Sequence, residues 1–167
     1  MNNIKIRKIK IQDLEQGLAI YNHYIENSFS NFEEKKFTLQ KFKKLVYDNF
    51  SKKIPFLVAE IDKKIVGIAY LNEFRSKSGY KYAFENTIYI HSNFIGQGVG
   101  NKLLKSLLSI SKKNKMIKTI IAVIGGYKNS SSIAIHKKYG FKKIGILKKV
   151  GFKKNRWLDA VYMQKII

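Results

Sequence analysis

With 167 residues, of which 45% are hydrophobic and 13% aromatic, the chain can bury the core of one globular domain and is too apolar to be disordered. It has no cysteine, which excludes disulfides and thiolate-bound metal, and its apolar runs are far shorter than the ~20 residues that span a membrane. Its net charge of +22 comes from lysines scattered along the whole chain, which favours a solvated surface that attracts polyphosphates over a nucleic-acid-binding face.

The first third of the chain predicts a strand and two helices. Residues Ile4–Ile9 alternate apolar and basic side chains, which is typical of a strand. Asp13 is placed to cap a helix whose apolar residues recur at helical spacing as far as Ile25. After the polar, loop-like segment 27–36, a second helix is expected to begin at Thr38 and to run to about Phe50.

The middle of the chain predicts three strands. Residues Phe56–Ile61 and Ile65–Phe74 read as a hairpin around the polar segment 62–64. Residues 75–81 form a loop, and Tyr82–Ile90 alternates again as a strand does.

The last third predicts two helices and three strands. One helix should follow a glycine-rich segment and end near Asn114, and a shorter one should end near Gly140. Thr119–Ile124 is a continuous β-branched run of the kind found in buried strands, and the strands Lys142–Val150 and Trp157–Lys165 close the chain. The order β-α-α-β-β-β-α-β-α-β-β indicates an α/β protein with a mixed sheet flanked by helices.

The glycine-rich segment FIGQGVGNKLLKSLL, residues 94–108, has glycines at positions 96, 98 and 100. From Gly100 onward the apolar residues recur at i+3, i+4, i+7 and i+8, so a helix packed on the sheet begins within the glycines. A helix N-terminus offers unpaired N–H groups and a partial positive charge, and glycine lets a ligand approach the backbone. The segment therefore predicts a phosphate or pyrophosphate site, with a tight turn that binds nothing as the alternative. Its spacing matches neither GxGxxG nor a Walker motif.

Longer stretches of the chain resemble one family. ENTIYIHSNFIGQGVGNKLLKSLL followed by NSSSIAIHKKYGFKKIG resembles the acetyl-CoA-binding core of the GNAT N-acetyltransferases. IRKIKIQDLEQGLAIYNHYI, PFLVAE, FRSKSGY and VGFKKNRWLDAVYMQ look like the phosphinothricin and methionine-sulfoximine acetyltransferase branch. The resemblance implies one domain over residues 1–167, with a mostly antiparallel, twisted α/β sheet whose central strands splay. It also implies acetyl-CoA as co-substrate, no metal, and a homodimer.

The resemblance assigns the acetyl-CoA site to two segments. The backbone N–H groups from Ile95 to Gly100 would hold the pyrophosphate, although Ile95 stands where the family usually has Arg or Gln. The backbone of Ile88–Ile90 would pair with the pantetheine arm as an extra strand does, and the N–H of Ile88 would polarise the acetyl carbonyl. The expected cofactor-binding residues are Ile88, Tyr89, Ile90, Ile95, Gly96, Gln97, Gly98, Val99, Gly100, Asn101, Asn129, Ser131 and His136.

Glu85 is the expected catalytic base. A carboxylate is out of place in the apolar strand Tyr82–Ile90, and partial burial should raise its pKa; a glutamate on the exposed face of the strand is the alternative. The family resemblance places its base at this glutamate. His136 stands where many relatives carry a tyrosine that protonates the leaving thiolate, so it is expected either to do the same or to serve packing and CoA contact. Tyr139 is the other candidate for that proton.

The acceptor is expected to meet the loop FRSKSGY. Arg75 is one of few arginines in a lysine-rich chain, and a guanidinium can clamp a carboxylate with two hydrogen bonds; a plain surface cation is the alternative. By resemblance this loop binds the carboxylate of an amino-acid-like substrate, although Lys77 replaces a common family arginine. The expected substrate-binding residues are Phe32, Arg75, Ser76, Lys77, Glu85, Asn86 and Thr87.

The sequence thus predicts a cytoplasmic enzyme that transfers the acetyl group of acetyl-CoA to a small amino acid or analogue. The amine would attack the thioester directly in a ternary complex, because the chain has neither a cysteine nor a Gly-x-Ser-x-Gly elbow. Acetylation of a polyamine, an aminoglycoside or a protein N-terminus is the alternative within this family. A basic nucleic-acid-binding module is the alternative from another class, although we expect no nucleic-acid partner and no membrane association.

Overall fold

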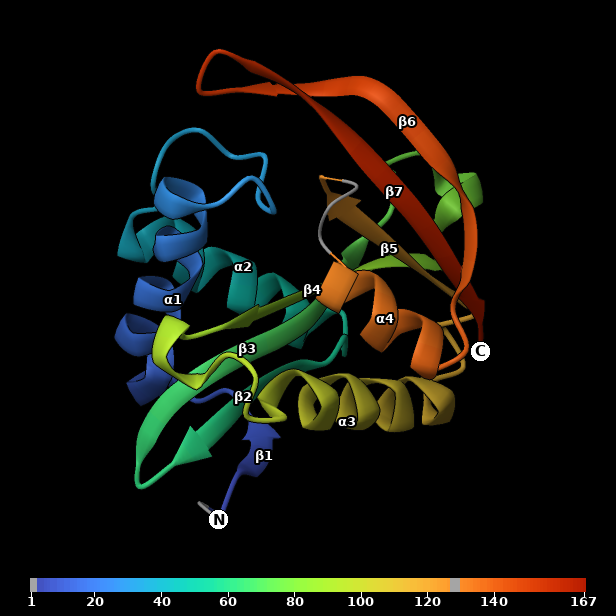
Figure 1. Ribbon diagram of the computed structural model, residues 1–167. Helices are drawn as coiled ribbons and strands as arrows, with labels where there is room; N and C mark the ends of the chain where they lie inside the picture. Colours follow the sequence, from blue (N-terminus) through green and yellow to red (C-terminus); the bar gives the residue numbers. More distant parts are fainter. Residues whose placement is uncertain (1–2, 127–129) are drawn as a thin grey trace.

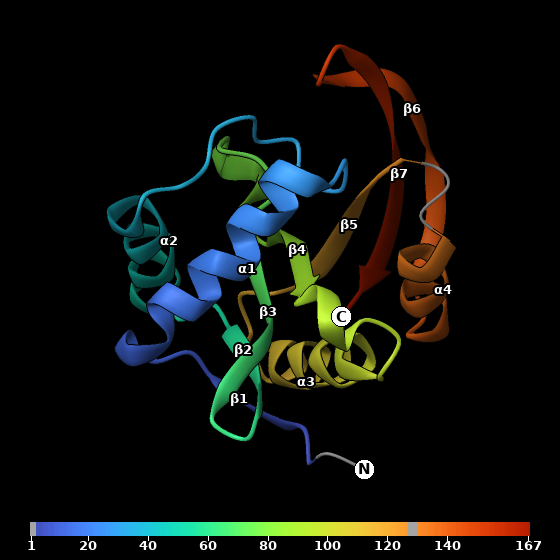
Figure 2. The ribbon, with the colours of Figure 1, turned by 60° about the vertical axis from the view of Figure 1, so that its left-hand side comes forward.

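The structure, a computed structural model, describes residues 3–126 and 130–167, in which seven strands form one sheet covered by four helices (Figures 1 and 2). Helices α1 and α2 lie on one face of the sheet and α3 and α4 on the other. The strands follow the order β1-β2-β3-β4-β5-β7-β6 across the sheet. The bounds are β1 (Lys5–Lys8), α1 (Leu14–Asn27), α2 (Leu39–Ser51), β2 (Phe56–Ile61), β3 (Lys64–Glu73), β4 (Ala83–Ile90), α3 (Val99–Lys113), β5 (Thr119–Gly125), α4 (Ser130–Lys138), β6 (Lys142–Lys153) and β7 (Arg156–Ile166).

The predicted order of helices and strands is confirmed. Thr38 caps α2 as expected, because its hydroxyl accepts a hydrogen bond from the N–H of Lys41 at 3.1 Å. The β2–β3 hairpin turns through Asp62 and Lys63, whose φ angles are 47° and 63°. Positive φ at both central residues gives the turn whose twist matches that of the flanking strands.

Alternate residues of each strand enter two different cores. In β2, Leu57 packs in the core under α3, whereas Phe56 packs in the core under α1 and α2. The same alternation holds in β4, where Phe84 belongs to the α3 core and Tyr89 to the α1 core. The even-numbered residues of β4 therefore face α3 and α4, and the odd-numbered residues, Glu85 among them, face α1.

Asp13 occupies the predicted N-cap position of α1, but its side chain makes its hydrogen bonds elsewhere. Its carboxylate makes no side-chain cap bond and accepts instead from the backbone N–H of Lys10 at 2.7 Å and from Arg7 at 2.6 and 2.9 Å. Arg7 also donates from Nε to Glu60 at 2.7 Å. Burial would raise the pKa of Asp13, yet the hydrogen bonds from Arg7 and Lys10 outweigh it and hold this pKa below the usual value. The Arg7 guanidinium thus links β1 to β2 and to the start of α1. The spacing of residues in the sequence does not reveal this set of contacts.

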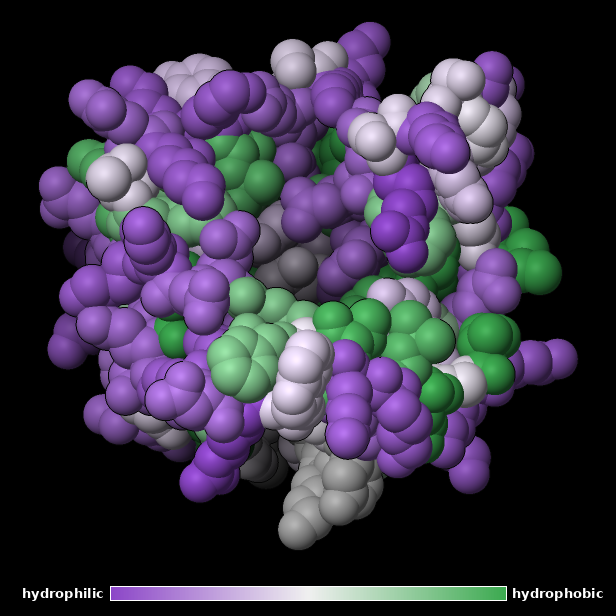
Figure 3. All heavy atoms as spheres, turned by 90° about the horizontal axis from the view of Figure 1, so that it is seen from above, coloured by the Kyte–Doolittle hydropathy of each residue, from purple (hydrophilic) through white to green (hydrophobic). Residues whose placement is uncertain are grey.

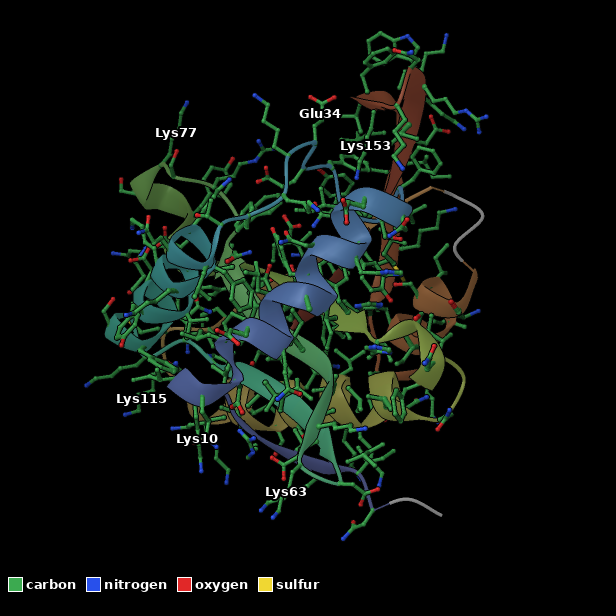
Figure 4. The ribbon with its side chains drawn as sticks, turned by 90° about the vertical axis from the view of Figure 1, so that its left-hand side faces the viewer. Lys10, Glu34, Lys63, Lys77, Lys115 and Lys153 are labelled. Carbon is green, nitrogen blue, oxygen red and sulfur yellow. The ribbon has the colours of Figure 1, made fainter. Side chains whose placement is uncertain are left out.

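The lysine-rich surface is dispersed. Lys77 points outward at one end of the molecule, while Lys10 and Lys63 point outward at the opposite end (Figure 4). No helix in the described residues is both long and apolar enough to cross a membrane.

Strands β4 and β5 are parallel neighbours that soon part. Their pairing covers three residue pairs and ends at Glu85 and Ile121, after which β4 continues to Ile90 and β5 to Gly125. The predicted splay of the central strands is thereby confirmed. The opening lies directly beside Glu85, and the β6–β7 hairpin arches over this side of the molecule (Figure 1).

Candidate active site

Two cavities meet where β4 and β5 part. The larger, of about 450 Å³, lies between the separated strands, the N-terminus of α3 and the helix α4. The smaller, of about 350 Å³, lies on the α1 side of the sheet. Seen from above, this face of the molecule has a hollow bordered by hydrophilic residues on one side and by hydrophobic residues on the other (Figure 3). Residues that line both cavities are Ser30, Glu85, Thr87, Tyr89, Val123 and Gly125.

The glycine loop forms one end of the larger cavity. Gly96 and Gly98 both have φ of 81°, a conformation that side-chain-bearing residues rarely adopt, and Gly98 is the N-cap of α3. A Cβ at either glycine would meet no atom within 4 Å, so backbone conformation and not crowding requires glycine here. The unpaired N–H groups at this helix end suit an anion such as pyrophosphate. Of the predicted loop residues, those lining the cavity are Ile95, Gly96, Gly98, Val99, Gly100 and Asn101.

Three further residues were predicted to bind the cofactor: Gln97, Ser131 and Asn129. Gln97 is not among the residues lining the cavity, and its side chain donates to the carbonyl of Asn93 at 2.9 Å. Ser131, near the start of α4, does line the cavity. Asn129 lies outside the described residues.

The free edge of β4 forms the wall opposite β5. Odd-numbered residues of β4 pair with β3, as the bond from His91 N to Val66 O at 2.9 Å shows, so the backbone of Ile88 faces the cavity. The backbone of Ile90 is engaged by a side chain that sequence reasoning missed. The Tyr24 hydroxyl donates to Ile90 O at 3.0 Å and accepts from Ile90 N at 3.3 Å. Tyr24 also stacks on Tyr89, with ring centroids 4.3 Å apart.

Glu85 lies at the junction of the two cavities. Burial raises the pKa of its carboxyl group to about 7, and the charge of Arg75 lowers it in part. A carboxyl group with a pKa near neutrality can accept a proton from a substrate at physiological pH. The wall of the smaller cavity around it carries hydroxyl and amide groups from Tyr21, Asn31, Tyr70, Asn72 and Thr87.

His136 is buried on the other face of β4, beside Asn86. Its Nε2 lies 2.9 Å from Asn86 Nδ2, and its Nδ1 lies 2.7 Å from the carbonyl oxygen of Ser132. Burial lowers the pKa of His136 despite the bond to Ser132. Both residues line the larger cavity, and Asn86 does not line the smaller one, where an acceptor-binding residue was expected.

The loop that carries Arg75, Ser76 and Lys77 does not reach the cavities. All three residues are exposed and none lines either cavity. Arg75 lies with its guanidinium 5.2 Å from the Phe74 ring centroid and acts on Glu85 through its charge. Lys77 points away from the molecule (Figure 4). The carboxylate clamp predicted from the sequence stays a prediction, with its three side chains outside both cavities in this structure.

Phe32 does line the smaller cavity, and its ring fits between two glycines. A Cβ at Gly125 would lie 2.8 Å from the ring, and one at Gly151 would lie 2.7 Å from it. The loop that carries Phe32 is held by Lys153, a residue that sequence reasoning missed. The Lys153 ammonium donates to the carbonyls of Ser28 at 3.0 Å and Asn31 at 2.6 Å, and the residue is 2% exposed. Figure 4 shows it at the hairpin end of the molecule, near the loop that carries Glu34.

We expect Lys153→Met to raise the KM for the acceptor by about tenfold, because the wall that carries Phe32 loses both charge-assisted hydrogen bonds. The KM for acetyl-CoA should change little, since Lys153 lines neither cavity. Steady-state kinetics with each substrate varied in turn measure both values. Lys142→Met, an exposed lysine on the same strand, is the matched control. Equal changes in both KM values would contradict a role confined to the acceptor side.

Among the described residues, no group of three His, Asp or Glu side chains could hold a metal ion. The two cavities offer a carboxyl base, backbone N–H donors and an anion-binding helix end.

Comparison with known proteins identifies the family to which these features belong. The pattern described as an acetyltransferase (GNAT) domain matches residues 6–162. A phosphinothricin N-acetyltransferase of Alcaligenes faecalis is 35% identical over 160 residues, which cover 96% of this chain and 81% of that protein.

Solved structures show the same architecture. A ribosomal-protein-alanine N-acetyltransferase from Brucella melitensis has a TM-score of 0.94 and 36% identity, over 98% of this chain and 99% of that one. A GNAT superfamily phosphinothricin acetyltransferase from Sinorhizobium meliloti, in complex with acetyl-CoA, has a TM-score of 0.92 and 30% identity, over 98% of this chain and 88% of that one.

Proposed function

This chain belongs to the GNAT acetyltransferase family and is an acetyl-CoA-dependent N-acetyltransferase, and on that premise we propose that its acceptor is a small amino acid or analogue such as phosphinothricin or methionine sulfoximine. The smaller cavity, at about 350 Å³, suits an acceptor of that size, and it is lined by groups that hydrogen-bond polar substituents. The name of the phosphinothricin acetyltransferase with 35% identity supports the same class.

One observation carries the mechanism: Glu85, with a pKa near 7, lies where the acceptor cavity meets the larger cavity. We propose that Glu85 accepts a proton from the acceptor ammonium, directly or through water, so that the amine can attack the thioester carbon. The N–H of Ile88 stabilises the charge that develops on the carbonyl oxygen. The glycine loop binds the pyrophosphate, and Arg75 acts on the acceptor side through its positive charge.

The test is the release of free CoA from acetyl-CoA with a panel of acceptors. The panel holds phosphinothricin, methionine sulfoximine, methionine sulfone, ordinary amino acids, spermidine, an aminoglycoside and a peptide that begins with alanine. Turnover on the amino acids or their analogues is the expected result. Turnover on the polycations or the peptide alone would overturn the acceptor class while leaving the reaction intact.

A peptide N-terminus is the second candidate acceptor. The structure with 36% identity is named for acetylation of ribosomal-protein alanine, and Glu85 could deprotonate either kind of α-amine. The alanine peptide in the panel separates the two, because a free amino acid offers a carboxylate beside its amine and the peptide does not.

We also propose that the enzyme is a cytoplasmic homodimer that associates through the β6–β7 hairpin. Phe152 and Trp157 are cross-strand partners whose rings lie 5.1 Å apart, and they are 50% and 62% exposed. Neighbouring Val150 is also 49% exposed. Exposed apolar side chains that gather on one element are typical of interfaces between chains.

Trp157→Arg is expected to turn the dimer into a monomer, because the charge cannot be desolvated at a packed interface. Sedimentation equilibrium measures the mass, with Tyr80→Arg, an exposed aromatic of another loop, as the control. A wild type that sediments as a monomer at all concentrations would sink the proposal.

A further inference from the structure

Asn86 and His136 form a buried pair whose hydrogen-bonding roles can be assigned. Asn86 is 7% exposed and His136 is 4% exposed. His136 Nδ1 lies 2.7 Å from the Ser132 carbonyl, which can only accept, so Nδ1 carries the hydrogen. A neutral ring then has its lone pair on Nε2, which accepts from Asn86 Nδ2 at 2.9 Å. The imidazole thereby fixes which way the Asn86 amide is turned.

With its nitrogen turned to His136, the Asn86 amide turns its oxygen away from the histidine. Asn86 Oδ1 is buried and has no hydrogen-bond partner among the described residues. Buried polar atoms are nearly always paired, so an orphaned acceptor beside a cavity indicates a ligand that supplies the donor. Asn86 lines the larger cavity together with Ile88.

The strand geometry decides which substrate supplies that donor. Glu85 and Thr87 face α1 and line the smaller, acceptor cavity, whereas Asn86 faces α4 and does not. The larger cavity runs from the glycine loop along the free edge of β4, the path proposed for the pantetheine arm. That arm contains amide N–H groups, which are donors of the kind that Asn86 Oδ1 lacks.

We propose that Asn86 Oδ1 accepts a hydrogen bond from a pantetheine amide N–H of acetyl-CoA, and that His136 is a positioning residue that holds the Asn86 amide in the accepting orientation. This inference rests on the proposed acetyl-CoA site. It assigns Asn86 to the binding of acetyl-CoA, whereas the sequence predicted that Asn86 binds the amine substrate. It also makes His136 a hydrogen-bond acceptor toward Asn86, which leaves no Nε2 hydrogen for a leaving thiolate.

Calorimetric binding of CoA and of adenosine 3′,5′-bisphosphate, which lacks the pantetheine arm, tests the proposal. Asn86→Leu should weaken CoA binding by about tenfold and leave bisphosphate binding unchanged. Asn27→Leu, the same change at an exposed asparagine that lines neither cavity, should leave both affinities unchanged. Equal weakening of both ligands by Asn86→Leu, or no weakening, would overturn the proposal. Failure of the wild type to bind CoA at all would instead overturn the acetyl-CoA site itself.

The orientation of the Asn86 amide can be tested separately, through the protonation state of His136. A long-range ¹H–¹⁵N correlation NMR spectrum of the wild type should show His136 protonated at Nδ1 and unprotonated at Nε2. His136→Gln can still donate a hydrogen bond to or accept one from Asn86, so it should keep CoA affinity better than His136→Phe does. A histidine protonated at Nε2 in the free protein would contradict the assigned orientation of Asn86.

Discussion

Glu85→Gln is expected to lower kcat/KM by at least about 100-fold, the usual contribution of a positioned general base. Glutamine keeps the size of the side chain and one of its two acceptor oxygens but cannot accept a proton. The Kd of acetyl-CoA, measured by calorimetry, should stay close to the wild-type value. A variant with wild-type kcat/KM would show that another group deprotonates the amine.

The pH dependence gives a second signature of Glu85. With a pKa of about 7, kcat/KM should rise with pH and level off above that value, and the inflection should vanish in Glu85→Gln. The folded protein keeps a proton on Glu85 between about pH 4.5 and pH 7, where the unfolded chain has lost it. The free energy of unfolding therefore falls as pH rises through this window, and the fall should be smaller in Glu85→Gln. Glu73→Gln, an exposed carboxylate paired with Lys52, is the control.

Arg7→Met is expected to lower the free energy of unfolding by about 3 kcal/mol and Tm by roughly 6–12 °C. The Asp13 carboxylate, 4% exposed, would stay buried without its cation, and Glu60 would lose the same partner. Chemical denaturation at pH 7 measures the loss. Arg7→Lys should recover only part of it, because an ammonium cannot bridge both carboxylates as a guanidinium fork does.

The effect of Arg7→Met should shrink in acid. The pKa of Asp13 is held below its usual value in the folded protein, so the stability that Asp13 contributes is present above its unfolded pKa. It is lost as pH falls through the folded pKa. A loss of stability that is equal at pH 3 and pH 7 would show that Arg7 acts through packing and not through its charge.

Local patterns in the sequence were enough to predict the order of elements. The β2–β3 turn, the Thr38 cap and the start of α3 depend on neighbouring residues alone, so each can be found from a short window. The burial and raised pKa of Glu85 were also predictable, because the sequence places this carboxylate within an apolar strand. The contact of Tyr24 with the backbone of Ile90 was not predictable, because the fold brings together two residues that lie 66 positions apart in the sequence.

The errors share a physical cause. Asp13 is a good N-cap residue at the right position, but its carboxylate oxygens accept hydrogen bonds from the Arg7 guanidinium of β1 instead. Lys153 is one lysine among many in the sequence, and only the packing of the β6–β7 hairpin on the loop after α1 buries it. The role of Arg75 in binding the acceptor stays a prediction; its exposed side chain lines neither cavity in this structure.

Beyond Glu85 and Ile121, neither β4 nor β5 has the other as its partner, and we expect this gap to make the lifetime of the protein depend on its substrate. A strand edge without a partner opens more readily than a paired one, and opened segments are where proteases cut. A ligand present at 100 times its Kd stabilises the folded state by about 2.7 kcal/mol. In a starved cell with little acetyl-CoA, the enzyme should therefore be degraded faster, and its abundance should follow the carbon supply without any dedicated regulator.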